Sequence, residues 1–277
     1  MLTSLREHFP INMLCEVLDV PRSSVYYKNR TIEERPIREA LVDAADQWPT
    51  YGYLRLTAML KRQGYVVNAK RIRRLMHELG IAGEPRKIKP RTTDSGHAYP
   101  RYPNLVQDMK VIRSEQVWVA DITSIRLRKE FIYLAVVMDV FTRCVRGRHL
   151  GPSLEHELTM TALRKAFKHG RPEINHSDQG VQCAATAYVE LVLKAGSAIS
   201  MASVGEPREN GYAERLMRTI KEEEVDPSEY EDLADARRRS ARFLDDVYNT
   251  MRIHSALGYL MHQEFEQGWN EDTSMDA

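Results

Sequence analysis

The stretch that decides the fold runs from residue 174, where it reads INHSDQG, to residue 221, where it ends PRENGYAERLMRTIK. Its first part is a short, mostly apolar segment that ends at Asp178, which predicts a strand leaving a sheet into a loop. Its last part opens with Pro207 and carries apolar residues at helical spacing around Glu214, which predicts a long helix. The two acids have 35 residues between them, and we expect them at a strand end and on a covering helix.

A third acid, Asp121, lies upstream in the apolar run VWVADIT at residues 117–123. This run predicts a strand, and the closely spaced apolar segments after it predict an antiparallel meander. Helices and strands alternate further on, so we expect an α/β domain with a five-stranded mixed sheet. The expected strands are residues 117–127, 131–140, 143–150, 174–178 and 198–201, and the expected helices are 153–168, 184–194, 207–224 and 232–248.

The first part of the chain predicts an all-α region with two helix-turn-helix-like pairs. The first pair spans residues 11–28, and an unspecialised helical hairpin explains its pattern equally well. The second pair lies within residues 51–82 and ends in a helix that Asn68 is suited to cap. The cations of that last helix suit phosphate contacts, although a solvated helix face is the structural alternative. The candidate DNA-binding residues of the two pairs are Arg22, Ser23, Ser24, Lys70, Arg71, Arg73 and Arg74.

The overall charge of +1 conceals an asymmetry along the chain. Residues 1–112 hold 19 Lys and Arg against 12 Asp and Glu (+7), and the remainder holds 21 against 27 (−6). A basic front end joined to an acidic body predicts a module that binds a polyanion. A basic, proline-rich linker follows the second pair, and its Lys87, Lys89 and Arg91 are further candidates for DNA contact.

Composition argues against several classes of protein. Apolar runs fall short of the roughly 18 residues of a membrane span, and no secretory pattern opens the chain. Three scattered cysteines, Cys15, Cys144 and Cys183, argue against a disulfide framework and fit a reducing compartment. We therefore expect a cytoplasmic protein that has no membrane partner.

The chemistry of the expected site rests on Asp121, Asp178 and Glu214. A carboxylate buried in an apolar strand must be neutralised, paired or bound to a metal, because an unpaired buried charge is costly. Hard oxygen ligands with open positions suit Mg²⁺ or Mn²⁺, and two such ions can promote breaking or joining of phosphodiester bonds. The structural alternative pairs Glu214 with Arg218 and leaves Asp121 as a hydrogen-bonded buried acid.

Three further residues of the predicted helix are candidates for roles beside these acids. Arg218 and Lys221 follow Glu214 by one and two turns on the same face, so both are expected to hold DNA phosphate. Asn210 precedes Glu214 by one turn and is expected either to orient it or to contact DNA.

Other polar residues compete for these roles. We expect Asp139 to turn the chain and pair with Arg143, and we expect the acids at residues 222–224 to be exposed. His176 lies close to Asp178 and suggests nucleophilic catalysis, but no base-orienting constellation accompanies it. Support for Asp178 is therefore the expected role of His176.

Taken together, these motifs resemble those of bacterial insertion-sequence transposases of the OrfB type, which have a retroviral-integrase-like DDE catalytic core. The resemblance covers nearly the whole chain, and its most specific features are the 35-residue gap before Glu214 and the offset of Lys221. The matching segments are residues 51–56, 71–76, 118–123, 176–180, 210–221 and the tail motif YNTMRIHSALGY at 248–259.

The resemblance implies an RNase H-like core in which Asp121, Asp178 and Glu214 ligate two Mg²⁺ ions and Lys221 contacts DNA. It implies nicking at the ends of an element, attack of the freed 3′-OH on a phosphodiester, and a copy-out–paste-in route. The implied partners are double-stranded DNA, as terminal inverted repeats and target, and a homo-oligomer that is at least a dimer. A helix-turn-helix protein encoded upstream, often fused by frameshifting, is a further implied partner.

Some features depart from the family pattern. The tail motif usually continues into Thr-Pro, but residues 260–262 read LMH, which leaves the last residues without a predicted structure. Cys183 stands where an aromatic residue is common, and the zinc-binding domain of retroviral integrases is absent. Within the tail motif, Arg252 and His254 either contact DNA or brace the helix that bears Glu214.

The sequence divides into five parts. These are residues 1–50 and 51–82 with the helix-turn-helix-like pairs, the linker 83–112, the catalytic core 113–225, and a C-terminal helix and tail, 226–277, packing on the core. Two rival functions stay open, namely a DNA-binding regulator that is catalytically silent alone, and an RNase H-like nuclease that cleaves without joining.

Overall fold

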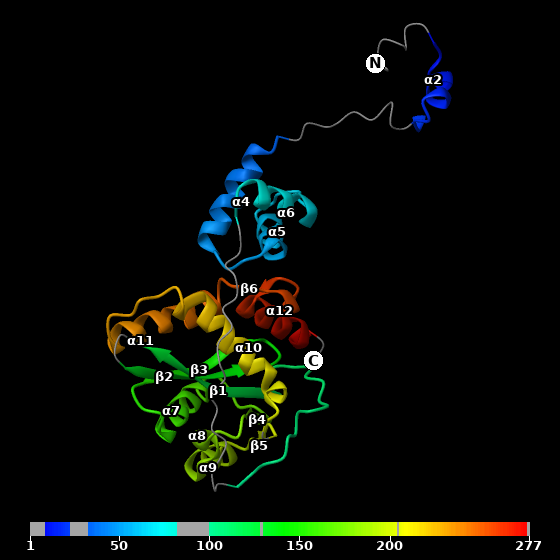
Figure 1. The fold of residues 1–277 in the computed structure, drawn as a ribbon. Helices are drawn as coiled ribbons and strands as arrows, with labels where there is room; N and C mark the ends of the chain where they lie inside the picture. Colours follow the sequence, from blue (N-terminus) through cyan, green and yellow to red (C-terminus); the bar gives the residue numbers. More distant parts are fainter. Residues whose placement is uncertain (1–8, 23–32, 82–99, 128–129, 204, 276–277) are drawn as a thin grey trace.

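The computed structural model describes residues 9–22, 33–81, 100–127, 130–203 and 205–275 (Figure 1). Its centre is a five-stranded mixed sheet with the strand order β3-β2-β1-β4-β5. The first three strands form an antiparallel meander, and β4 and β5 extend it in parallel from β1. The predicted α/β class with five strands is therefore confirmed. The strands are β1 (Val117–Arg126), β2 (Phe131–Asp139), β3 (Val145–Gly151), β4 (Ile174–Ser177) and β5 (Ala198–Met201).

Helices cover both faces of the sheet because successive side chains of a strand point to opposite faces. Val117 and Val119 of β1 belong to the core cluster beneath α10 and α11. Trp118 and Ala120 belong to the cluster on the other face, which α7, α8 and α9 cover (Figure 1). These helices are α7 (His156–Ala166), α8 (Val181–Ala184), α9 (Thr186–Lys194), α10 (Gly211–Ile220) and α11 (Leu233–Arg242).

The helical region before the sheet forms a compact module of its own. Its three helices share a core that includes Leu41, Leu56 and Ile72. The Asn68 side chain accepts a hydrogen bond from the Arg71 N–H at 2.9 Å, which is the predicted cap. The module consists of α4 (Arg35–Gln47), α5 (Tyr53–Arg62) and α6 (Ala69–Glu78), so α4 packs with α5 and α6 although the sequence division placed it with residues 1–50.

The first predicted helix-turn-helix pair is described only in part. Its first helix is α2 (Ile11–Val17), and Arg22 is also described. The rest of the pair, including Ser23 and Ser24, lies outside the described residues.

The C-terminal segment contacts both the core and the helical module. A short hairpin of β6 (Ile253–His254) and β7 (Leu260–Met261) leads into α12 (His262–Met275). Ile253 lies in the core of the helical module. On the other side, α12 packs aromatic rings on the core, with the Trp269 ring centroid 4.7 Å from that of Phe141. The last residues, whose structure the sequence pattern did not predict, thus form helix α12, which packs on the core.

A buried ion pair joins the two parts of the molecule. The guanidinium of Arg252 is 1% exposed and donates two hydrogen bonds of 2.7 Å to the Glu223 carboxylate. Arg55 of the helical module lies 3.9 Å from the same carboxylate. Glu223 was expected to be exposed, so that expectation was wrong. Arg252 therefore braces the segment that follows α10, which is one of the two roles expected of it.

Wide helical turns explain why the sequence pattern missed this contact. The helix predicted over residues 207–224 consists of the 3₁₀ turn η1 (Pro207–Asn210), then α10, then the π-helical segment η2 (Lys221–Val225). A second π-helical segment, η3 (Phe243–Tyr248), extends α11. A π-helical turn rotates the side chains after it relative to an α-helix, so α-helical periodicity misplaces them.

No described helix is long and apolar enough to cross a bilayer.

Asp139 turns the chain after β2, as expected, although without the expected partner. Its carboxylate accepts hydrogen bonds from the backbone N–H groups of Thr142 (2.7 Å) and Glu115 (2.8 Å). The guanidinium of Arg143 instead lies over the ring of Tyr212, 4.0 Å from its centroid. Asp139 is thus a structural residue, and Arg143 is directed toward α10.

We predict that Gly147→Ala destabilises the core. A Cβ atom there would lie 2.2 Å from the Ala162 carbonyl oxygen and 2.6 Å from the Ala166 N–H nitrogen. Both are backbone atoms of α7, and the helix backbone cannot move away without a large energetic cost. Overpacking of this kind costs about 1–3 kcal/mol, measured by urea denaturation. The matched control is Gly268→Ala in α12, where a Cβ meets nothing within 4 Å. Equal stability of the two variants would contradict the close approach of α7 to β3.

We predict that His262 makes stability depend on pH. His262 is buried, its ring stacks on Tyr248, and Nδ1 donates to the Tyr248 carbonyl at 2.6 Å. Burial, and then the neighbouring His254 and Arg252, lowers the pKa of His262 to about 3. The unfolded chain therefore binds the proton first, so this contribution is present above pH 6.5 and is lost as pH falls from 6.5 toward 3.

The test is the slope of unfolding free energy against pH between 4 and 6. His262→Asn should lower that slope by about 1.4 kcal/mol per pH unit, the value for one proton. His77→Asn, at an exposed position, is the control and should leave the slope unchanged. An unchanged slope in His262→Asn would show that the imidazole titrates normally.

Candidate active site

The pairing of β1 with β4 places the two aspartates next to each other. Val119 pairs with His176 and Ala120 with Ser177 in parallel register, and one further step sets Asp178 beside Asp121. Neighbouring strands lie about 4.8 Å apart, so the two carboxylates share one edge of the sheet. Asp121 lies two residues after Val119 on the same strand, so both side chains point to the same face of the sheet, which α10 covers.

Glu214 joins this pair from α10, where it occupies the first turn and is exposed. Asn210, at the start of that helix, is buried and donates to the Ala120 carbonyl at 3.4 Å. The start of α10 is thereby tied to β1 directly before Asp121. Asn210 is accordingly placed to orient the helix, and a DNA contact by Asn210 would require it to become exposed.

The electrostatics of Asp121 record the proximity of the other acids. Burial, and after it the charge of Asp178, raises the pKa of Asp121 to about 7. A hydrogen bond from the Ile122 N–H, 2.7 Å long, acts in the opposite direction. Glu214 adds a smaller increase, and Lys221 lowers the pKa. All three predicted acids and the predicted lysine thus lie within electrostatic reach of one another around Asp121.

A tight turn fixes Asp178 at the end of β4. Its Oδ1 accepts a hydrogen bond from the Gly180 N–H at 3.1 Å. A Cβ at Gly180 would lie only 3.0 Å from that same oxygen. The glycine therefore leaves room for the carboxylate, a role that the sequence reasoning did not assign to it.

His176 supports the sheet and the loop before α10 rather than acting as a nucleophile's base. Its Nε2 lies 3.2 Å from the Glu209 carbonyl, which can only accept, so Nε2 donates and Nδ1 accepts from the Ser200 hydroxyl at 2.8 Å. Burial lowers the pKa of His176, so the ring is neutral. It links β4, β5 and η1, and thereby positions α10 opposite Asp178.

The donor set has the chemistry of a site for a hard divalent cation. Burial is the main cause of the raised pKa of Asp121, and repulsion from Asp178 and Glu214 adds to it; a bound cation would relieve both. In the described part of the chain, however, no group of three or more His, Cys, Asp or Glu side chains is close enough to hold a metal ion. The residues fit a metal site in type and position, while their side chains do not form a closed set of ligands.

The predicted DNA-binding cations differ in their surroundings. Arg218 is exposed on α10, and Lys221 lies close enough to Asp121 to affect its pKa. Arg71 and Arg74 of α6 both pair with Glu34 of the neighbouring segment. The remaining candidates are Arg73, which lies over the Tyr53 ring, Lys70, which is exposed, and Lys87, Lys89 and Arg91, which lie outside the described residues.

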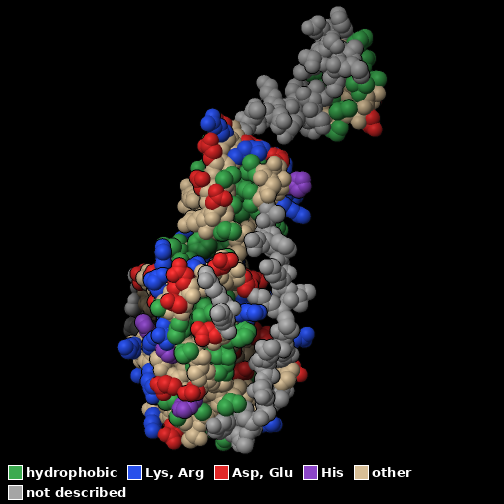
Figure 2. Space-filling model, turned by 60° about the vertical axis from the view of Figure 1, so that its left-hand side comes forward, with side chains coloured by type: hydrophobic (Ala, Val, Ile, Leu, Met, Phe, Trp, Pro, Cys, Tyr) green, Lys and Arg blue, Asp and Glu red, His purple; other side chains and the backbone are tan. Residues whose placement is uncertain are grey.

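These ion pairs give the helical module a mixed surface. On the face drawn in Figure 2, Lys and Arg side chains lie beside Asp and Glu side chains over the module. Arg74 pairs with Glu78 at 2.6 Å as well as with Glu34. DNA contact by α6 would therefore compete with these pairs, and it stays a prediction.

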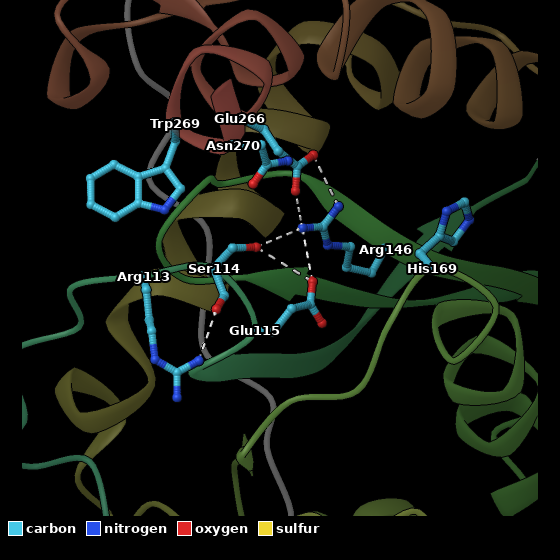
Figure 3. Close-up of a pocket in the computed structure, with 8 residues that line it drawn as sticks. All are labelled: Arg113, Ser114, Glu115, Arg146, His169, Glu266, Trp269 and Asn270. Atoms are coloured by element: carbon cyan, nitrogen blue, oxygen red, sulfur yellow. Dashed lines mark hydrogen bonds and ion pairs between the residues drawn. The ribbon is translucent and has the colours of Figure 1, made fainter. Parts of the chain in front are cut away.

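A separate cavity of about 580 Å³ lies away from the carboxylates. Arg146 is its central side chain and bridges Glu115 of the core (3.0 Å) and Glu266 of α12 (Figure 3). This bridge anchors α12 on the sheet, and the lining contains none of the three acids. The lining residues are Arg113, Ser114, Glu115, Arg146, His169, Glu266, Trp269 and Asn270.

Comparison with protein families agrees with this geometry. Residues 30–89 match an HTH-like domain, and residues 113–207 and 195–261 match two models described as integrase core domain. The transposase of insertion sequence element IS904 from Lactococcus lactis is 30% identical over 221 residues, which cover 78% of this chain and 87% of that protein. This chain belongs to the family of insertion-sequence transposases.

A second curated relative matches over nearly the full length of both chains. The transposase of IS629 from Shigella sonnei is 28% identical and covers 97% of this chain and 95% of its own length. The HTLV-2 integrase catalytic core domain, solved in complex with magnesium, is 19% identical with a TM-score of 0.39, covering 55% of this chain and 97% of that one. The chain is thus a DNA transposase of the OrfB type with an integrase-like core and an HTH-like domain.

We predict that Gly180→Ala impairs transposition more than folding. Its Cβ would push the Asp178 carboxylate by a few tenths of an ångström, and small displacements of catalytic groups are costly. Strand-transfer rate should fall about tenfold or more, with the melting temperature nearly unchanged. Gly211→Ala, where a Cβ meets nothing within 4 Å, is the control and should keep wild-type activity. Full activity in Gly180→Ala would indicate that Asp178 takes no part in strand transfer.

Proposed function

We propose that this transposase cuts the ends of its element and joins them to DNA by a two-metal DDE mechanism. Asp121, Asp178 and Glu214 are the proposed ligands of two Mg²⁺ or Mn²⁺ ions. The observation that carries the proposal is the register of β1 and β4, which sets the two aspartates side by side on the face that α10 covers. The proposed route is copy-out–paste-in.

The chain's own residues have separate proposed tasks. Asp121 and Asp178 provide fixed oxygen ligands on rigid strands, and Asn210 holds the start of α10 so that Glu214 faces them. Lys221 and Arg218, on the helix and the turn after it, hold the DNA phosphate beside the acids. When bound, the two cations stabilise the attacking and the leaving oxygen of the displaced phosphodiester.

DNA recognition is the proposed role of the helical module. Lys70, Arg71, Arg73 and Arg74 would neutralise phosphates, with Glu34 giving up its ion pairs in exchange. Joining two ends of one element requires two DNA-bound copies, so we propose at least a dimer. A helix-turn-helix protein from the upstream reading frame is a proposed further partner or fusion.

The test incubates the protein with Mg²⁺, a labelled terminal inverted repeat of its element and target DNA. Asp121→Asn, Asp178→Asn and Glu214→Gln should each reduce joined product by about a thousandfold or more, because each removes a ligand of the transferring centre. All three variants should still bind the labelled end. Glu190→Gln, on the exposed side of α9, is the control and should join DNA like the wild type.

Three outcomes would contradict the proposal. Nicked DNA that is never joined would indicate a nuclease, and end binding without any covalent change, even with the upstream partner added, would indicate a regulator. Joined product that persists in Asp121→Asn would remove the two-metal site from the reaction.

A further inference from the structure

Four arginines gather where the helical module meets the catalytic helix. Arg252 is held by Glu223, and Arg55 of α5 approaches the same carboxylate from the module. Arg143 reaches α10 from the turn after β2, with its guanidinium over the Tyr212 ring. Arg215 lies on α10 one turn after Tyr212, so it belongs to the same face of that helix. We call these four residues the junction arginines.

The positive charge of this cluster is poorly balanced. Both recorded ion pairs use the same carboxylate, that of Glu223. Arg143 and Arg215 form no salt bridge in the described part of the chain, and the Nε of Arg143 is buried without a hydrogen-bond partner. Among the described residues, the four guanidinium groups therefore have ion pairs with one carboxylate between them, in a partly buried setting where a missing counter-charge is costly.

The positive charges of the junction arginines affect the pKa of a neighbouring histidine, His254. Burial lowers the pKa of His254, and the charges of Arg252, Arg143, Arg55 and Arg215 lower it further, to about 3. All four arginines are therefore close enough to His254 for their charges to act on its imidazole. His254 stays neutral there and does not add a fifth charge.

We propose that three of the junction arginines, Arg55, Arg143 and Arg215, bind a phosphate group of the DNA backbone as it passes from the helical module to the catalytic helix, while Arg252 stays paired with Glu223. Guanidinium groups match phosphate in geometry and are always charged. A phosphate here would supply the charge that Glu223 alone does not balance. Arg215 follows Glu214 directly, so the bound strand would continue toward the acids. This inference rests on the proposed function, because it takes DNA to be the ligand of both parts.

The first experiment measures end binding against salt concentration in the absence of divalent metal. Arg55→Gln with Arg215→Gln should lower the slope of log affinity against log salt by about 0.9, the value for one phosphate. Arg164→Gln with Lys194→Gln removes two exposed charges at the far end of the core and should leave the slope unchanged. An unchanged slope in the folded junction variant would overturn the proposal.

A second variant covers the case in which the double variant fails to fold. Arg215→Gln alone changes a half-buried residue of α10 and leaves the buried pair of Arg252 and Glu223 intact, so it should fold and should weaken end binding roughly three- to tenfold. Arg164→Gln alone, at an exposed position, is the control and should bind the end like the wild type. Unchanged end binding by folded Arg215→Gln would assign the cluster a structural role only.

Two further comparisons separate the sources of failure. Inorganic phosphate could raise the melting temperature of the wild type while the salt dependence of DNA affinity stays the same in the junction variants. In that case the junction arginines bind a free anion, and the proposed DNA contact is overturned. Because these assays contain no divalent metal, their outcome is independent of strand transfer. Loss of catalysis in the Asp121, Asp178 and Glu214 variants therefore tests the proposed function alone.

Discussion

The parallel pairing of β1 with β4 is the constraint on which the rest of the structure depends. It fixes Asp121 and Asp178 on adjacent strands, and the alternation of side chains directs both toward α10. The hydrogen bond from Asn210 to the Ala120 carbonyl, and the bridge of His176 to Glu209 and Ser200, then hold the start of α10 over that edge. The backbone therefore places Asp121 and Asp178 at one edge of the sheet and ties the start of α10 to that edge.

The second organising feature is the contact between the helical module and the core. Arg252 and Glu223 form a buried pair, and a buried pair of this kind is strongly destabilising when one partner is removed. Because Glu223 belongs to the segment that continues α10, this pair ties the helical module and the C-terminal segment to the helix that bears Glu214.

The sequence predicted the sheet and the elements that carry Asp121, Asp178 and Glu214 because the signals of these elements are local. Asp121 lies in a β-branched run, Asp178 ends an apolar segment, and Glu214 lies at helical spacing. Contacts between distant residues carry no such signal, and Arg252 and Glu223 are 29 residues apart. The ion pairs of Arg71 and Arg74 with Glu34 were missed for the same reason.

Other features were missed because they depend on backbone geometry. The π-helical turn at Lys221–Val225 rotates Glu223 into the junction, so a rule based on 3.6 residues per turn placed it in solvent. The burial of Asn210 follows from its carbonyl partner on β1, which the spacing to Glu214 does not reveal. Helix α12 forms because Phe265 and Trp269 find Phe141 on the core, a partner far away in the sequence.

The most direct test of the central claim is electron paramagnetic resonance of Mn²⁺ in the complex with an element end. Two ions sharing the carboxylates of Asp121, Asp178 and Glu214 would lie about 3.5–4 Å apart and would give an exchange-coupled spectrum. The account predicts this spectrum in the wild type and its loss in Asp121→Asn. A spectrum of isolated ions, or a coupled spectrum that persists in Asp121→Asn, would contradict it.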